Sequence, residues 1–162
     1  MDILKECAEL AKKHEGLYTL KDDGLVYAYH DPVGYPTIGY GNLLSMVKYG
    51  DLSQYKPKTV EECEKDLEQE LAKKSAIVLS MSPVLAKPEN AYRLVAITDF
   101  AFNLGEGNYK KSTLKKRIDA EDWESAVVEI KKWDKAGGKV MGGLVKRRAD
   151  EAALLVREVG NA

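Results

Sequence analysis

Residues 14–42 read HEGLYTLKDDGLVYAYHDPVGYPTIGYGN, and they mark a change from a helical to a strand-forming pattern. Before this stretch, residues 2–14 place Ile3, Cys7 and Leu10 on one helical face, and Gly16 is a typical helix stop. Within it, YTL, LVYAYH and PTIGYG are rich in β-prone residues and are separated by the turn signals DDG and DPVG. The stretch therefore predicts a short helix followed by a small sheet.

The rest of the chain has a helical pattern. Thr59 begins a capping box, TVEE, and helical spacing continues to about Met81. Further helices are predicted at 89–104, 109–118, 123–135 and 143–159, with breaks at LGEGN, DAED and AGGKVMGG. We predict an α+β fold, mostly α, in a single domain. Its parts are a β lobe at about 15–58, a connecting helix at 59–81, and a helical lobe of residues 82–162 plus the N-terminal helix 2–14.

Composition excludes several classes of protein. The chain has 162 residues, 44% of them hydrophobic and 31% charged, as expected of a globular domain. Cys7 and Cys63 fall on apolar helical stripes, which favours free core thiols, and two Cys with two His in no ligand spacing argue against a metal site. No apolar run is long enough for a membrane span, and the first residues lack a signal-peptide pattern. We predict that Trp123 and Trp133 pack in the core of the protein.

Four acids lie in the opening stretch: Glu15, Asp22, Asp23 and Asp31. Glu15 falls at the end of the predicted helix, where the negative end of the helix dipole and partial burial favour a protonated carboxyl, as a general acid requires. Asp31 begins the DPVG turn, and Asp22 and Asp23 lie in DDG, so each has an ordinary structural explanation. Two carboxyl groups facing one cleft, one protonated and one ionised, would form a glycosidase apparatus.

Three motifs in order carry a family resemblance. They are Glu15-Gly16 with DPVGYPTIGYG (31–41), FNLGEGNYKKSTLKKRI (102–118) and WDKAGGKVMGGLVKRRADE (133–151). Together they span most of the chain and closely resemble the phage-type lysozymes, the endolysin muramidases. The resemblance implies a lysozyme-like fold and a glycoside hydrolase that cleaves the β-1,4 bond between N-acetylmuramic acid and N-acetylglucosamine in bacterial peptidoglycan, causing host cell lysis.

The resemblance also implies site residues. Glu15 matches the glutamate that protonates the glycosidic oxygen, Asp31 matches the second carboxylate, and Thr37 matches the threonine near the water and the reacting face of the sugar. One of Arg147 or Arg148 is expected to approach Glu15. Three further positions match residues that line the saccharide cleft: Leu43, Phe102 and Ser112.

The chain departs from the family pattern in two places near the site. Fifteen residues separate Glu15 from Asp31, where the family usually has about eight, and we interpret the surplus as a longer hairpin. If that interpretation is wrong, Asp23 becomes the catalytic partner. Asn42 also stands where the family often has histidine, which would change a hydrogen bond in the cleft.

Rival functions remain open at this point. A lytic transglycosylase has the acid but typically no second carboxylate, so Asp31 and Thr37 argue against it. A non-catalytic wall-binding or nucleic-acid-binding protein could use the basic C-terminal half, where residues 82–162 carry 15 basic and 12 acidic side chains. The lysines of residues 110–117 have acids nearby, and the chain is not strongly basic, which argues against nucleic acid.

The predicted partners depend on this assignment. We expect a monomer that acts on peptidoglycan glycan strands with no metal or organic cofactor and without inserting into a membrane. Because no export signal is recognisable, it should stay in the host cytoplasm until the membrane is permeabilised and then reach the periplasm and cell wall. The family resemblance implies that a holin-type protein opens the membrane.

Overall fold

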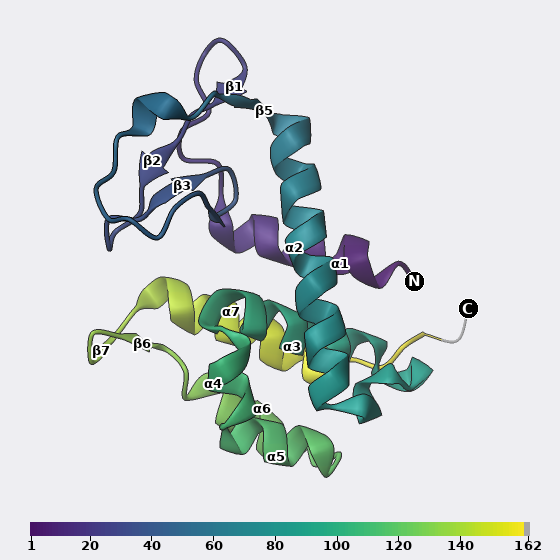
Figure 1. Ribbon diagram of the computed structural model, residues 1–162. Coiled ribbons are helices and arrows are strands. Elements are labelled where there is room, and N and C mark those ends of the chain that lie inside the picture. Colours follow the sequence, from purple (N-terminus) through teal and green to yellow (C-terminus); the bar gives the residue numbers. More distant parts are fainter. Residues whose placement is uncertain (161–162) are drawn as a thin grey trace. The chain divides into compact units, whose positions relative to one another are not determined.

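The computed structural model describes residues 1–160, which form two compact units (Figure 1). The sheet unit comprises residues 8–69, and the helical unit comprises residues 1–7 and 70 onward. The boundaries between the units fall within two helices, α1 (Ile3–Glu15) and α2 (Val60–Met81). Residues 161 and 162, part of the predicted helical lobe, lie outside the described residues.

The sheet unit contains five two- or three-residue strands, all paired antiparallel. β2 (Tyr29–His30), β3 (Pro36–Ile38) and β4 (Asn42–Leu43) form one sheet, and β2 and β3 lie side by side in Figure 1. β1 (Leu25–Val26) pairs with β5 (Lys58–Thr59). The predicted strand YTL contributes only an isolated bridge from Leu20 to Val26, so that part of the prediction was wrong. The short 3-10 helix η1 (Leu52–Gln54) lies between β4 and β5.

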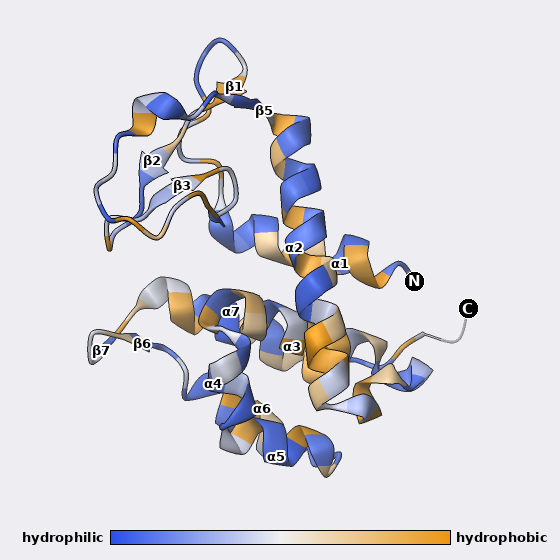
Figure 2. Cartoon of the chain, viewed as in Figure 1, coloured by the Kyte–Doolittle hydropathy of each residue, from blue (hydrophilic) through white to orange (hydrophobic). Residues whose placement is uncertain are grey.

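Helix α2 begins where its capping box predicted. The Thr59 backbone N–H donates to Oε1 of Glu62 at 3.2 Å, and the Glu62 N–H donates to Oγ1 of Thr59 at 3.1 Å. Each side chain thus satisfies a backbone donor that the first turn leaves without a partner. The helix alternates hydrophobic and hydrophilic residues along its length (Figure 2).

The helices of the helical unit differ from their predictions in three places, one of which is α7 (Gly142–Leu155), which ends four residues before the predicted end at 159. The expected helix 109–118 is two helices, α4 (Glu106–Lys110) and α5 (Thr113–Asp119), because Ser112 caps α5 and ends the first run. The expected helix 123–135 stops early, as α6 (Trp123–Lys131), and a hairpin comes after it. Its strands are β6 (Lys135–Ala136) and β7 (Lys139–Val140). Gly137 and Gly138 make the turn at positive φ of 58° and 79°, which side chains rarely adopt.

The remaining elements of this unit surround one hydrophobic core. They are η2 (Pro83–Ala86), η3 (Pro88–Asn90), α3 (Ala91–Leu104) and α7 (Gly142–Leu155). α7 packs against α3 and α6, and α6 packs against α5. Trp123 and Trp133 pack on this core, as predicted, and the Trp133 ring meets Phe100 edge-on at 5.4 Å.

Both cysteines are buried and free, as the sequence predicted. Burial, followed by the nearby Asp99 carboxylate, raises the pKa of the Cys7 thiol to about 12. A thiol with so high a pKa stays protonated and is a poor nucleophile near neutral pH. Cys7 therefore acts as a small packing residue.

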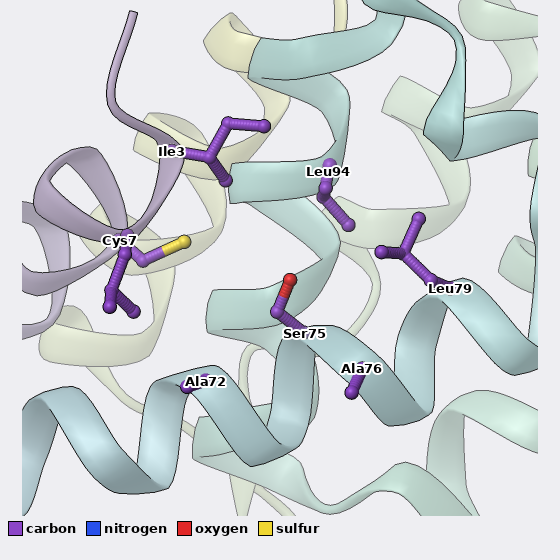
Figure 3. A pocket seen from close by; sticks show the side chains of 8 residues that line it. Ile3, Cys7, Ala72, Ser75, Ala76, Leu79 and Leu94 are labelled. Carbon is purple, nitrogen blue, oxygen red and sulfur yellow. The ribbon is translucent and has the colours of Figure 1, made fainter.

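A cavity of about 340 Å³ lies in the helical unit beside Cys7 (Figure 3). Small residues on α2, Ala72 and Ala76, leave the space, and leucine and isoleucine side chains close around it. Apart from the thiol, Ser75 carries the one polar side-chain group in its lining, and no carboxyl group is present. This apolar cavity therefore has no group that could carry out carboxylate chemistry.

The described residues offer neither a membrane-spanning helix nor a metal-binding cluster. No helix within residues 1–160 combines the length and apolar character that crossing a membrane requires. The same residues contain no group of three or more His, Cys, Asp or Glu side chains arranged to hold a metal ion.

Candidate active site

Glu15 is the last residue of α1, and two glycines shape its surroundings. Gly16, at φ +70°, donates its N–H to the Lys12 carbonyl at 3.3 Å and ends the helix. Gly41 lies beside the Glu15 carboxylate: a Cβ added there would be 3.4 Å from Oε2. Gly41 also has φ +85°, so any side chain would strain the backbone while crowding the acid. The end of TIGYG therefore leaves room around Glu15.

Asp31 is held by the turn that it begins, as the sequence predicted. Its Oδ1 accepts hydrogen bonds from the backbone N–H groups of Val33, Gly34 and Tyr35 at 2.9, 2.8 and 2.9 Å. Among residues 1–160, no hydrogen bond reaches its other oxygen, Oδ2. The turn therefore fixes the carboxylate in place while one oxygen stays available for a water molecule or a substrate.

Thr37 lies in the middle of the three-stranded sheet. It is only 4% exposed and pairs with Tyr29 on β2 and with Leu43 on β4. Its hydroxyl donates to the Tyr35 carbonyl at 2.8 Å, which leaves the oxygen lone pairs as acceptors. Leu43 is 49% exposed, so the side chain next to Thr37 across the strands is accessible.

Tyr29 connects the two acids, and the sequence reasoning did not single it out. Partial burial raises the pKa of its phenol, and the carboxylates of Glu15 and Asp31 raise it further. The phenol of Tyr29 therefore lies within the electrostatic range of both acids. No local sequence signal could have identified Tyr29, because its position follows from the strand register, in which Tyr29 pairs with Thr37.

The alternative partner, Asp23, lies in the hairpin turn as expected. Its Oδ2 accepts from the Tyr27 hydroxyl at 2.5 Å, and its Oδ1 accepts from the Leu25 N–H at 2.9 Å. The bond from Tyr27, then the bond from Leu25, lowers the pKa of this exposed carboxyl. Both oxygens of Asp23 are thus occupied in closing its own turn, whereas the turn amides of Asp31 bond only its Oδ1.

Two other predicted cleft residues belong to the helical unit. Phe102 is a partly buried residue of α3. Ser112 is 6% exposed, and its hydroxyl accepts from the Lys115 N–H at 3.0 Å and donates to the Tyr109 carbonyl at 2.7 Å. Ser112 therefore caps α5, and contact of either residue with a saccharide stays a prediction.

The histidine position of the family pattern is Asn42 here, and its amide has a partner. It donates to Oδ2 of Asp66 at 3.4 Å, and the same oxygen receives Nζ of Lys58 at 2.5 Å. Asn42 thus links β4 to helix α2 within the sheet unit.

Arg147 and Arg148 are buried in the helical unit with acidic partners. Arg147 binds Asp99 through Nε at 2.9 Å and through a terminal nitrogen at 2.8 Å. Arg148 binds Oε2 of Glu151 and Oδ1 of Asn103, each at 2.8 Å. The approach of one arginine to Glu15 stays a prediction.

The two acids of this buried cluster also interact with each other. Burial, followed by a hydrogen bond with Asp99, raises the pKa of Glu151 well above its usual value. Burial opposes ionisation of Asp99 too, but bonds from Glu151 and Arg147 outweigh it and lower the pKa of Asp99. Of the two carboxyl groups, Glu151 is therefore the one that holds a proton.

With this geometry in view, comparisons identify the family. Residues 13–151 match the family described as phage lysozyme. The chain is 33% identical over 157 residues to an endolysin of Bacillus phage B103, covering 96% of this chain but 54% of that protein. It therefore spans about half the length of that relative. Against an endolysin of Acyrthosiphon pisum secondary endosymbiont phage 1 it is 33% identical over 160 residues, covering 95% of this chain and 97% of the relative.

A solved structure agrees with these relatives. The endolysin from Escherichia coli O157:H7 phage FAHEc1 superposes with a TM-score of 0.76 at 26% identity, covering 96% of this chain and 94% of that one. The chain belongs to the phage lysozyme family, a family of glycoside hydrolases of the muramidase class. The predicted resemblance and the mostly helical α+β, lysozyme-like fold are confirmed.

Proposed function

We propose that this chain is a phage endolysin: a single catalytic domain that hydrolyses the β-1,4 bond between N-acetylmuramic acid and N-acetylglucosamine in peptidoglycan and so lyses the host cell. Membership of the phage lysozyme family supports the substrate class. The observation that carries the assignment of residues is the geometry around the two acids: three turn amides fix one oxygen of Asp31, and Gly41 leaves room beside the carboxylate of Glu15.

In the proposed mechanism, Glu15 gives its proton to the glycosidic oxygen as the bond to the anomeric carbon breaks. The sugar then develops oxocarbenium character, which a carboxylate nearby stabilises. Space beside Gly41 would allow the leaving oxygen to reach Glu15. No cofactor is needed, because a carboxylic acid and water supply every proton that moves.

Asp31 supplies the second carboxylate. Three backbone N–H groups fix Oδ1, so Oδ2 is the oxygen that would orient a water molecule or attack the anomeric carbon. Thr37, which is buried in the three-stranded sheet and has free acceptor capacity, would bind the hydrogen of that water molecule. Contacts with the glycan are also proposed for three further residues: Leu43, Phe102 and Ser112.

The experiment is to digest purified peptidoglycan and analyse the soluble products by mass spectrometry. Reducing ends at N-acetylmuramic acid are expected, and they should be absent when Glu15 is replaced by glutamine. Anhydro-muramic ends would instead assign the chain as a lytic transglycosylase. Binding to the wall without any soluble product would assign it as a non-catalytic wall-binding protein.

The route to the wall is a separate proposal. A holin-type partner would open the host membrane, and the enzyme would then pass as a monomer from the cytoplasm to the periplasm and cell wall. Expression in a bacterial host should leave the culture intact until the membrane is permeabilised, and lysis should begin within minutes of permeabilisation. Lysis on expression alone, with an intact membrane, would contradict this dependence.

A further inference from the structure

The ring of Tyr49 lies directly on the turn that holds Asp31. Its backbone N–H donates to the Gly34 carbonyl at 2.7 Å, and a Cβ added at Gly34 would be 2.6 Å from the Cζ of the ring. The edge of the ring also meets the His30 imidazole, with the ring centres 5.7 Å apart and an interplanar angle of 62°. Only glycine at position 34 permits this contact. The ring therefore packs on the turn at Gly34 and against the imidazole of His30.

The rest of the ring is open to solvent. Tyr49 is 71% exposed. Three apolar residues near it in sequence or in the adjoining turn are also exposed: Val33 by 54%, Met46 by 72% and Val47 by 67%. Figure 2 shows hydrophobic segments on the loops next to β2 and β3. Exposed apolar side chains that form one contiguous patch often mark a binding site.

The backbone of Tyr49 is also unusual. It has φ +56°, one of two non-glycine residues at positive φ among residues 1–160. A bulky aromatic residue in this region carries a conformational cost, and such costs persist mainly where the surroundings require the geometry. Here the strained backbone places the ring on Gly34.

The link to the candidate site is short. Gly34 donates its N–H to the Asp31 carbonyl at 2.9 Å and to Asp31 Oδ1 at 2.8 Å. One residue thus lies between the aromatic ring and the carboxylate. The exposed ring therefore lies against the same turn that carries the candidate carboxylate.

We propose that Tyr49 is a saccharide platform, on whose open face a pyranose ring of the peptidoglycan glycan strand stacks during hydrolysis. Sugar rings present a face of C–H groups, and an aromatic side chain that is open on one side and fixed on the other suits such a face with little loss of conformational entropy. This inference rests on the proposed function, since it takes the glycan strand as the substrate.

The test measures both binding and turnover. Soluble, uncross-linked glycan strands are titrated against the Glu15→Gln protein and against the same protein with Tyr49→Ala, Tyr49→Phe or Tyr55→Ala added. Tyr55 is a partly exposed tyrosine that ends η1 in the same unit. Tyr49→Ala should weaken binding by roughly fivefold to tenfold, whereas Tyr49→Phe and Tyr55→Ala should leave it unchanged.

Turnover in the otherwise unaltered enzyme separates this inference from the proposed function. Tyr49→Ala should raise KM by a similar factor with kcat nearly unchanged, because the platform would bind substrate and transition state alike. Equal binding by the Tyr49→Ala and unaltered proteins would overturn the platform. An unaltered enzyme that releases no product would overturn the proposed function, while the binding titration would still decide the role of Tyr49.

Discussion

Each unit of the molecule contains a pair of acids, and the two pairs are built for different purposes. In the helical unit, Asp99 and Glu151 are completely buried and are bonded to arginines and to each other. In the sheet unit, Glu15 and Asp31 are partly exposed, and glycines and turn amides position them. If Glu15 and Asp31 act as proposed, the difference shows that surroundings, not residue type, decide whether a carboxyl group serves packing or chemistry.

The largest effect is expected at Glu15. Replacing it with glutamine removes the transferable proton and keeps the size of the side chain. Release of soluble fragments from peptidoglycan should fall by about 10²- to 10⁴-fold. Circular dichroism before and after heating should show the fold and its unfolding midpoint unchanged. A rate within a few fold of the unaltered enzyme would remove Glu15 from the chemistry.

Asp99 should matter for stability. Asp99→Asn removes the carboxylate that pairs with the buried Arg147 guanidinium, and loss of one partner of a buried pair typically costs about 3–5 kcal/mol. Chemical denaturation should show this loss as a lower midpoint. Lys87→Ala is the matched control, since it removes an exposed ion pair with Glu121 and should cost under about 1 kcal/mol. Equal costs for the two variants would contradict the role given to the buried cluster.

Asp31 tests whether one residue can serve both purposes. Asparagine keeps an oxygen that can accept the three turn amides, so Asp31→Asn should fold with little loss of stability. The negative charge is lost, and fragment release should fall by about 10²-fold. Asp23→Asn, at the other turn, should keep nearly full activity. Reversed results for the two variants would make Asp23 the catalytic partner.

Glu151 should give the smallest effect and a diagnostic pH dependence. The pKa of Glu151 is raised above 4.5, the usual pKa of a glutamate side chain. Above about pH 4.5, Glu151 therefore keeps its proton in the folded protein and loses it in the unfolded chain. The resulting stabilisation is present below that pH and is lost as pH rises toward the folded pKa. Glu151→Gln cannot titrate, so denaturation midpoints measured across this range should fall less steeply with pH than those of the unaltered protein. Identical slopes would contradict the assignment of the proton.

Local signals in the sequence predicted much of the fold. The capping box at Thr59 placed the start of α2, and the DPVG turn was correctly interpreted as a structure that Asp31 closes with its own side chain. The β6–β7 hairpin was missed because its turn is made by two glycines after a helical pattern, and a glycine indicates that a helix ends without indicating which structure comes next.

The site was less predictable, since its geometry depends on contacts across strands. The register that sets Tyr29 opposite Thr37 is one such feature, and no local pattern fixes it. The strained backbone of Tyr49 depends likewise on Gly34, fifteen residues earlier in the chain.

One matched pair of variants tests the central claim most directly: Glu15→Gln and Glu151→Gln, the same chemical change in each unit. Fragment release per folded molecule is measured for both, with the folded fraction taken from the unfolding curve of the same sample. The account predicts that Glu15→Gln nearly abolishes release, whereas Glu151→Gln releases fragments at close to the unaltered rate. Equal loss in both variants, or full activity in Glu15→Gln, would contradict the division of roles between the two pairs of acids.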